Sequence, residues 1–143
     1  MEYRRFGNDY YIRLDKDDEI HSSLLSVCEK ENISVAYIKG IGGCDKATVG
    51  IFDLEKKVYN EETVTAMLEM ISLDGNITTY EGKPYLHAHA TFAYREGGEA
   101  KLLSGHLISA VIGLTGEIIL SPANGKISRK YIEELGIRIW DFD

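Results

Sequence analysis

The chain has 143 residues, of which 44% are hydrophobic and 27% are charged. This length and balance predict a single globular domain over residues 1–143 that can bury a core of its own. Its 16 basic and 23 acidic residues give a net charge of −7, which excludes a generally cationic nucleic-acid binder.

The first residues and the apolar stretches predict neither export nor membrane insertion. Residues 1–7 lack the long apolar run of a signal peptide, and the apolar stretches fall short of the roughly 20 residues that cross a bilayer. The two cysteines, Cys28 and Cys44, form neither a CxxC motif nor a disulfide framework. We therefore expect a cytoplasmic protein with no membrane partner.

The N-terminal part of the chain predicts a strand followed by a helix. Apolar residues alternate with polar ones over residues 10–14, which is strand spacing. Asp17 or Asp18 can cap a following helix, because aspartate accepts hydrogen bonds from the free N–H groups of the first turn. One face of this helix carries an apolar stripe that predicts contact with a core. The stripe consists of Ile20, Leu24, Val27 and Cys28.

The middle of the chain predicts three strands separated by turns. Residues 33–38 are β-branched and aromatic, and they run into a glycine-rich loop or sharp bend at residues 40–43. Residues 47–54 and 63–73 indicate two further strands. The Asp-Gly-Asn sequence at residues 74–76 predicts a turn.

The C-terminal half predicts a hairpin and a short closing segment. Residues 85–94 and 101–112 are strand-like and flank the turn sequence Glu-Gly-Gly-Glu. After a bend, residues 117–120 add a strand, residues 128–135 predict a helical turn, and residues 137–142 predict an anchored end. The expected fold class is α+β, with a curled, largely antiparallel, barrel-like sheet and one main helix packed on it.

Three of the four histidines fall in the predicted hairpin. His87 and His89 lie two apart on one strand, so both side chains leave the same face. A two-residue turn at Gly97-Gly98 pairs position 96 with position 99, and paired residues then have numbers that add up to 195. That register places His106 directly opposite His89 on the same face.

Three imidazoles gathered in this way form a ligand set for Zn²⁺ or a similar divalent ion and leave one coordination position open. Two alternatives stay open at this point. The histidines could be satisfied sheet residues or a pH-sensitive cluster, and a bulge at Gly105 would turn His106 to the other face. His21, on the predicted helix, is assigned no role.

Glu69 is the candidate catalytic residue because it lies in the mostly apolar stretch 66–73. A carboxyl group held in apolar surroundings can serve as a general acid or base. The alternative is an ion pair with a lysine or arginine, including one across a subunit interface.

Five segments of the chain, taken together, form a specific pattern: residues 3–7, 39–43, 68–77, 82–91 and 105–107. In these segments the chain resembles the plants-and-prokaryotes-conserved (PPC) domain over nearly its whole length. The resemblance implies an α+β fold with a curled sheet, a homotrimer, and a metal ion, with zinc as the expected ion. It also implies a fold similar to that of acetolactate decarboxylase, a zinc enzyme with three metal-binding histidines.

The resemblance leaves more than one function open. The first is a metal-binding homotrimer that acts on a small molecule, by hydrolysis or decarboxylation of a small oxo acid. The alternative is a DNA-binding or regulatory module with structural histidines, since family members are often labelled DNA-binding. The AT-hook core Arg-Gly-Arg-Pro that plant members add to this domain is absent here. A third is a scaffold that recruits another protein.

Overall fold

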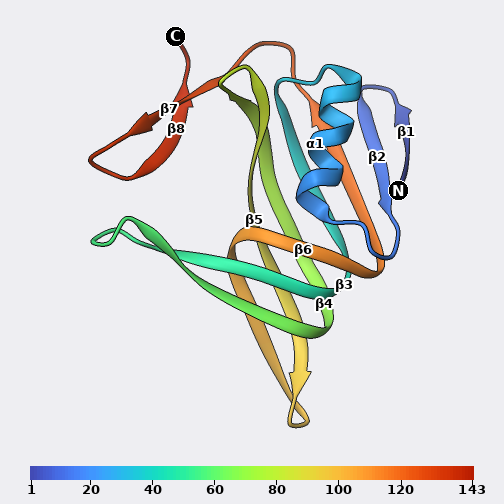
Figure 1. Cartoon of the computed structure of the whole chain (residues 1–143). Coiled ribbons are helices and arrows are strands. Elements are labelled where there is room, and N and C mark those ends of the chain that lie inside the picture. Colours follow the sequence, from blue (N-terminus) through green and yellow to red (C-terminus); the bar gives the residue numbers. More distant parts are fainter.

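The computed structural model describes residues 1–143, and strands dominate it (Figure 1). In chain order the elements are β1 (Glu2–Phe6), β2 (Asp9–Leu14), α1 (Ile20–Glu31), β3 (Ala36–Asp53), β4 (Val58–Tyr80), β5 (Lys83–Glu96), β6 (Glu99–Pro122), β7 (Ser128–Ile132) and β8 (Ile137–Asp141). All strand pairings are antiparallel except one between β4 and β7. The fold is therefore α+β, with one helix on a mostly antiparallel sheet.

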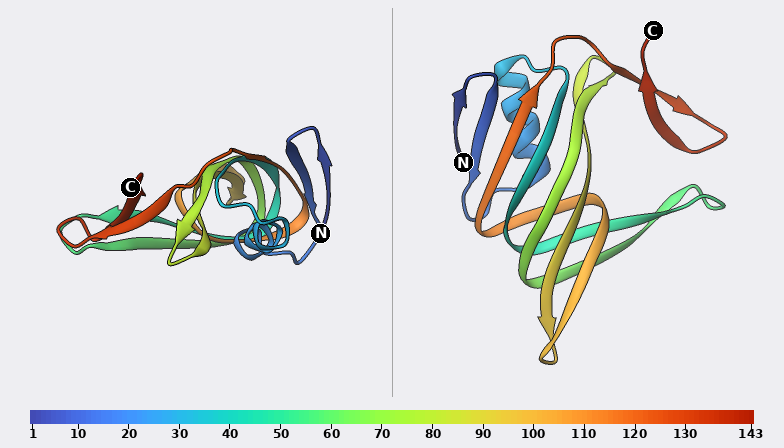
Figure 2. Two further views of the ribbon diagram at one scale, coloured as in Figure 1. Left: turned by 90° about the horizontal axis from the view of Figure 1, so that it is seen from above. Right: turned by 180° about the vertical axis from the view of Figure 1, so that it is seen from behind.

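The four long strands β3, β4, β5 and β6 pair in a closed cycle. β3 pairs with β4 and β6, and β5 pairs with the same two strands. β2 continues the sheet beside β6, and β1 continues it beside β2. The sheet is strongly bent, so the β3–β4 turn and the β5–β6 turn project from it in different directions (Figure 1 and Figure 2).

Helix α1 packs on one face of the sheet, against β5 and β6 (Figure 1). The predicted stripe is confirmed, since Ile20, Leu24, Val27 and Cys28 are all at most 1% exposed. The predicted cap is wrong: the side chain of Glu19 accepts hydrogen bonds from the backbone N–H groups of the first turn. The Asp18 carboxylate is engaged in the preceding turn, where it accepts from the N–H group of Asp15.

Two segments that predicted turns lie inside long strands. Residues 40–43 belong to β3, where a register shift between Gly40 and Gly42 bends the strand without interrupting it. Residues 74–76 belong to β4 and pair on both sides, with residues 37–39 of β3 and residues 87–89 of β5. Pairing on both sides of a central strand overrides the local turn preference of the Asp-Gly-Asn sequence.

The C-terminal segment also differs from the prediction. Residues 128–132 form strand β7 rather than a helical turn, because they pair with β8 to make a separate hairpin. Ile139 and Trp140 are 37% and 44% exposed, so the closing strand is not anchored in the core as expected. β1 was not among the expected strands. Helix α1, with 12 residues, does not meet the length and apolarity that a membrane-spanning helix requires.

Candidate metal centre

The β5–β6 hairpin has the predicted register. Its turn residues Gly97 and Gly98 have positive φ angles of 60° and 87°, a conformation that glycine adopts without steric cost. His89 pairs with His106 and Ala90 with Gly105, so no bulge interrupts these two strands at Gly105. The turn chemistry thus sets which residues of β5 and β6 face each other.

Strand alternation separates the histidines from the core. Leu86, Ala88 and Ala90 of β5 are buried, whereas His87 is half-buried and His89 exposed. His87 and His89 therefore lie on the outer face of the sheet, turned away from the buried side chains. His106 joins them from β6.

The three imidazole rings form a compact cluster. Their centroids lie 5.3 Å apart for His87 and His89, 5.1 Å for His87 and His106, and 5.6 Å for His89 and His106. One ring nitrogen from each residue lies within 4.8 Å of the other two. Ligand atoms around a tetrahedral zinc ion lie about 3.4 Å apart, so modest side-chain rotations would bring all three into coordination distance.

The environment of the cluster favours the neutral form of two of these imidazoles. Burial, reinforced by the other two histidines of the cluster, lowers the pKa of His106 to about 4. Burial, and then the positive charge of Arg129, lowers the pKa of His87. Metal ligation requires neutral imidazole, and lowered pKa values favour that form.

His106 also has an unmet bonding requirement. Its Nδ1 atom is buried and has no hydrogen-bond partner, although buried polar atoms are nearly always paired. Its ring is stacked on that of Tyr59, with centroids 4.5 Å apart and an interplanar angle of 18°. The donor set and this unpartnered nitrogen both fit a bound metal ion.

The structure brings two β4 residues to the cluster that the sequence analysis missed. Asp74 lies directly opposite His89, and Asn76 lies directly opposite His87. Asp74 accepts a hydrogen bond of 2.8 Å from the Tyr37 hydroxyl. Both were overlooked because residues 74–76 predicted a turn.

Arg129, from β7, is a third residue of this region that was overlooked. It is 7% exposed, and its Nη2 donates a hydrogen bond of 2.8 Å to the side-chain oxygen of Asn76. The segment around it predicted a helical turn, and no pattern in the sequence pointed to a buried arginine.

Glu69 does not join the histidines. It pairs with Ala93, four residues along β5 from His89, or about 13 Å at the rise of a strand. Leu68 and Met70 occupy the core-facing positions on either side of it, so Glu69 is exposed rather than held in apolar surroundings. His21 lies half-buried on α1 and is outside the cluster as well.

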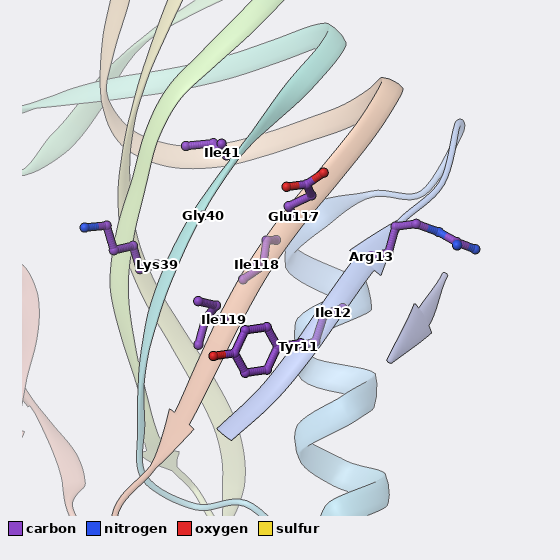
Figure 3. Close-up of a pocket in the computed structure, with 9 residues that line it drawn as sticks. All are labelled: Tyr11, Ile12, Arg13, Lys39, Gly40, Ile41, Glu117, Ile118 and Ile119. Atoms are coloured by element: carbon purple, nitrogen blue, oxygen red, sulfur yellow. The ribbon is translucent and has the colours of Figure 1, made fainter. Parts of the chain in front are cut away.

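The outer face of the sheet also carries an apolar groove of about 570 Å³. Figure 3 shows Tyr11 beside Ile119, with Ile41 further along the same face and α1 behind the sheet. A row of cross-strand partners connects this groove to the histidines: Tyr11, Ile119, Lys39, Asp74 and His89. The groove and the histidine cluster are therefore two parts of one outer face.

Comparison with solved structures identifies close relatives of the whole chain. A "putative DNA binding protein" from Bacteroides thetaiotaomicron is 33% identical, with a TM-score of 0.91 over 99% of this chain and 96% of that chain. A plant- and prokaryote-conserved (PPC) protein from Pyrococcus horikoshii is 29% identical, with a TM-score of 0.84 over 98% and 94% of the two chains. A metal-containing protein from Archaeoglobus fulgidus is 28% identical, with a TM-score of 0.83 over 97% and 96%.

A more distant match bears on the fold alone. A Staphylococcus aureus protein of unknown function, similar to alpha-acetolactate decarboxylase, is 13% identical, with a TM-score of 0.58 over 82% of this chain and 53% of that chain. No curated protein matches the chain. The family model of the Plants and Prokaryotes Conserved (PCC) domain matches residues 1–124. The chain therefore belongs to the Plants and Prokaryotes Conserved domain family, as its sequence motifs had indicated.

Proposed function

We propose that this chain is a metal-binding protein whose ion is held by His87, His89 and His106. The observation that carries the proposal is the convergence of three ring nitrogens, one from each histidine, within 4.8 Å of one another. The buried Nδ1 atom of His106, which lacks a hydrogen-bond partner, adds to it. The relative from Archaeoglobus fulgidus, described as metal-containing, supports it. Zinc is the expected ion, and imidazole ligands also suit iron, nickel and manganese.

Three protein ligands leave one position open on a zinc-like ion. There the ion can polarise a carbonyl group or lower the pKa of a bound water to about 7. This chemistry suits hydrolysis or decarboxylation of a small oxo acid. The chain itself supplies three imidazoles at fixed positions on two paired strands, and the Tyr59 ring covers one side of His106.

The working form is proposed to be a homotrimer. Tyr11, Ile41 and Ile119 expose 47%, 54% and 37% of their surface on the outer face in the single chain. Contiguous apolar surface of this kind is typical of an interaction site. Packing copies together over the groove would cover it and place a neighbour beside the histidine cluster.

Metal content of protein purified without added metal tests the proposed site. We expect about one equivalent of metal per chain, or uptake to that level on titration. The His106→Ala variant should lose the ion, while His21→Ala, which removes a histidine outside the cluster, should keep it. Less than about a third of an equivalent in the parent protein, with no uptake on titration, would discard the site.

A second candidate function is DNA binding, with the histidines in a structural role. The name of the Bacteroides thetaiotaomicron relative favours it, whereas the net charge of −7 opposes it. DNA binding predicts retardation of a duplex that weakens steeply as salt is added, because counterions are released from the phosphates. Absence of retardation at low salt and micromolar protein would remove this candidate.

A further inference from the structure

The feature that the metal site leaves unexplained is the buried guanidinium of Arg129. Its Nε donates to Thr78 Oγ1 at 2.7 Å, its Nη2 to Asn76 Oδ1 at 2.8 Å and its Nη1 to the carbonyl oxygen of Arg138 at 3.1 Å. All three acceptors are neutral, and no carboxylate forms an ion pair with Arg129. A buried charge is costly unless an opposite charge compensates it.

The position of Arg129 relates this charge to the histidine cluster. Its acceptors on β4, Thr78 and Asn76, lie directly opposite Tyr85 and His87 of β5. The guanidinium carbon lies 4.8 Å from the centre of the Tyr85 ring. Arg129 thus lies on the outer face beside His87, and its charge contributes to the lowered pKa of both His87 and His106.

A divalent ion on three neutral imidazoles would add two more positive charges to this region. Asp74 is the carboxylate nearest to the cluster by register, and it already accepts a hydrogen bond from Tyr37. Arg129 uses three of its five N–H groups in the bonds described, which leaves one on each terminal nitrogen. The site therefore combines excess positive charge with unused, charged donors.

We propose that the metal site binds a small carboxylate anion, and that Arg129 is the residue that recognises its negative charge. This inference rests on the proposed function, in which a small oxo acid is the substrate, and it names the residue that recognises the carboxylate of that substrate. Guanidinium is well suited to the role, because its planar donors match the two oxygens of a carboxylate. A ligand of this class would place its carboxylate on Arg129 and a second oxygen on the open coordination position of the metal ion.

The test uses protein loaded with Co²⁺, whose visible absorption reports changes at the ion, and pyruvate as the probe. Pyruvate should perturb the spectrum of the parent protein, and Arg129→Gln should weaken its binding about tenfold or more. The same variant should bind Co²⁺ as tightly as the parent or more tightly, because a nearby positive charge has been removed. A purely structural role of Arg129 would instead weaken Co²⁺ binding.

Two further variants make the outcome specific. Lys130→Gln removes the same unit charge from the next residue of β7, whose side chain is 49% exposed and pairs with Asp141. It should leave pyruvate binding unchanged. Arg129→Lys keeps the charge and loses the planar fork, so its affinity for pyruvate should lie between those of the parent and Arg129→Gln, and it remains informative if the glutamine variant does not fold.

The failures of the two proposals are distinguishable. If the parent protein binds no Co²⁺, the metal site itself is wrong and this inference falls with it. If Co²⁺ binds but pyruvate affinity is equal in the parent, Arg129→Gln and Arg129→Lys, the metal site stands and the role of Arg129 is overturned. Inorganic phosphate that binds about tenfold more tightly than pyruvate would overturn the assignment to carboxylates.

Discussion

The buried ring of His106 should govern how the metal-free protein responds to acid. Its pKa is about 4 in the folded chain, against 6.5 ordinarily. Between these values the unfolded chain binds a proton that the folded chain does not, so acid favours unfolding. The free energy of unfolding that depends on the neutral form of His106 is therefore fully present above pH 6.5, and it is lost as the pH falls to about 4. Urea unfolding of the metal-free protein at several pH values across this window measures the effect.

Replacing His106 tests whether this residue causes the pH dependence of stability. His106→Gln removes the titrating ring, so its free energy of unfolding should depend less on pH in this window than that of the parent. Equal pH dependence in the parent and His106→Gln would contradict the argument.

At the scale of elements, turn chemistry explains what the sequence could predict. Gly97-Gly98 fixed the register of β5 against β6, and with it the approach of His106 to His89. The same reasoning was available at Glu81-Gly82, whose positive φ angles of 51° and 77° close a two-residue turn between β4 and β5. That turn would have placed Asp74 opposite His89. The Asp-Gly-Asn sequence of residues 74–76 instead predicted a turn at Asp74 itself. Local turn preference does not show that a segment pairs with neighbouring strands on both sides.

The hairpin of β7 and β8 could not be predicted in the same way. Residues 128–135 contain good helix formers, and a local reading of propensity favours a helical turn there. The strand forms instead because β7 pairs with β8 and Arg129 is held by oxygens of β4, which are about fifty residues earlier in the chain. Glu69 shows the converse case, in which apolar neighbours in sequence do not mean apolar surroundings in space.

The close approach of the paired strands β4 and β5 at Gly75 allows a further prediction. A Cβ atom at this position would fall against the carbonyl oxygen of His87 and 2.7 Å from the Cβ of Ala88. Gly75→Ala should therefore push β5 away, lower the free energy of unfolding by about 1–3 kcal/mol and weaken metal binding. Chemical denaturation and metal titration of the same preparation check both effects.

Gly43→Ala is the matched control, because it makes the same change in a neighbouring strand. There the three atoms nearest to the added Cβ all belong to the side chain of Leu114, the nearest at 3.1 Å, and Leu114 is 62% exposed, so its side chain has room to move. Its stability and metal affinity should stay close to those of the parent. A loss of stability as large as that of Gly75→Ala would show that replacement of any strand glycine, rather than the close approach at Gly75, causes the loss.

At the scale of the whole molecule, the outer face predicts the behaviour of the chain in solution. Ile41 is 54% exposed at the groove, so a charge placed there would be buried if copies pack over this face. Ile41→Glu should convert the proposed trimer to monomer in sedimentation velocity, because burial of an unpaired charge costs several kcal/mol. Leu135→Glu, in the turn between β7 and β8, should leave the trimer intact. A parent protein that sediments as a monomer would contradict the proposed assembly.

The place of β6 between β2 and β3 has a consequence for biosynthesis. Leu14 of β2 pairs with Gly116 of β6, and Ala36 of β3 pairs with Pro122. A ribosome must therefore add about a hundred residues after β2 before that strand meets its inner neighbour, so the early part of the nascent polypeptide waits with unpaired edges. Premature termination before residue 116 would leave fragments prone to aggregate, and cells that make this protein have reason to shield it until β6 has emerged.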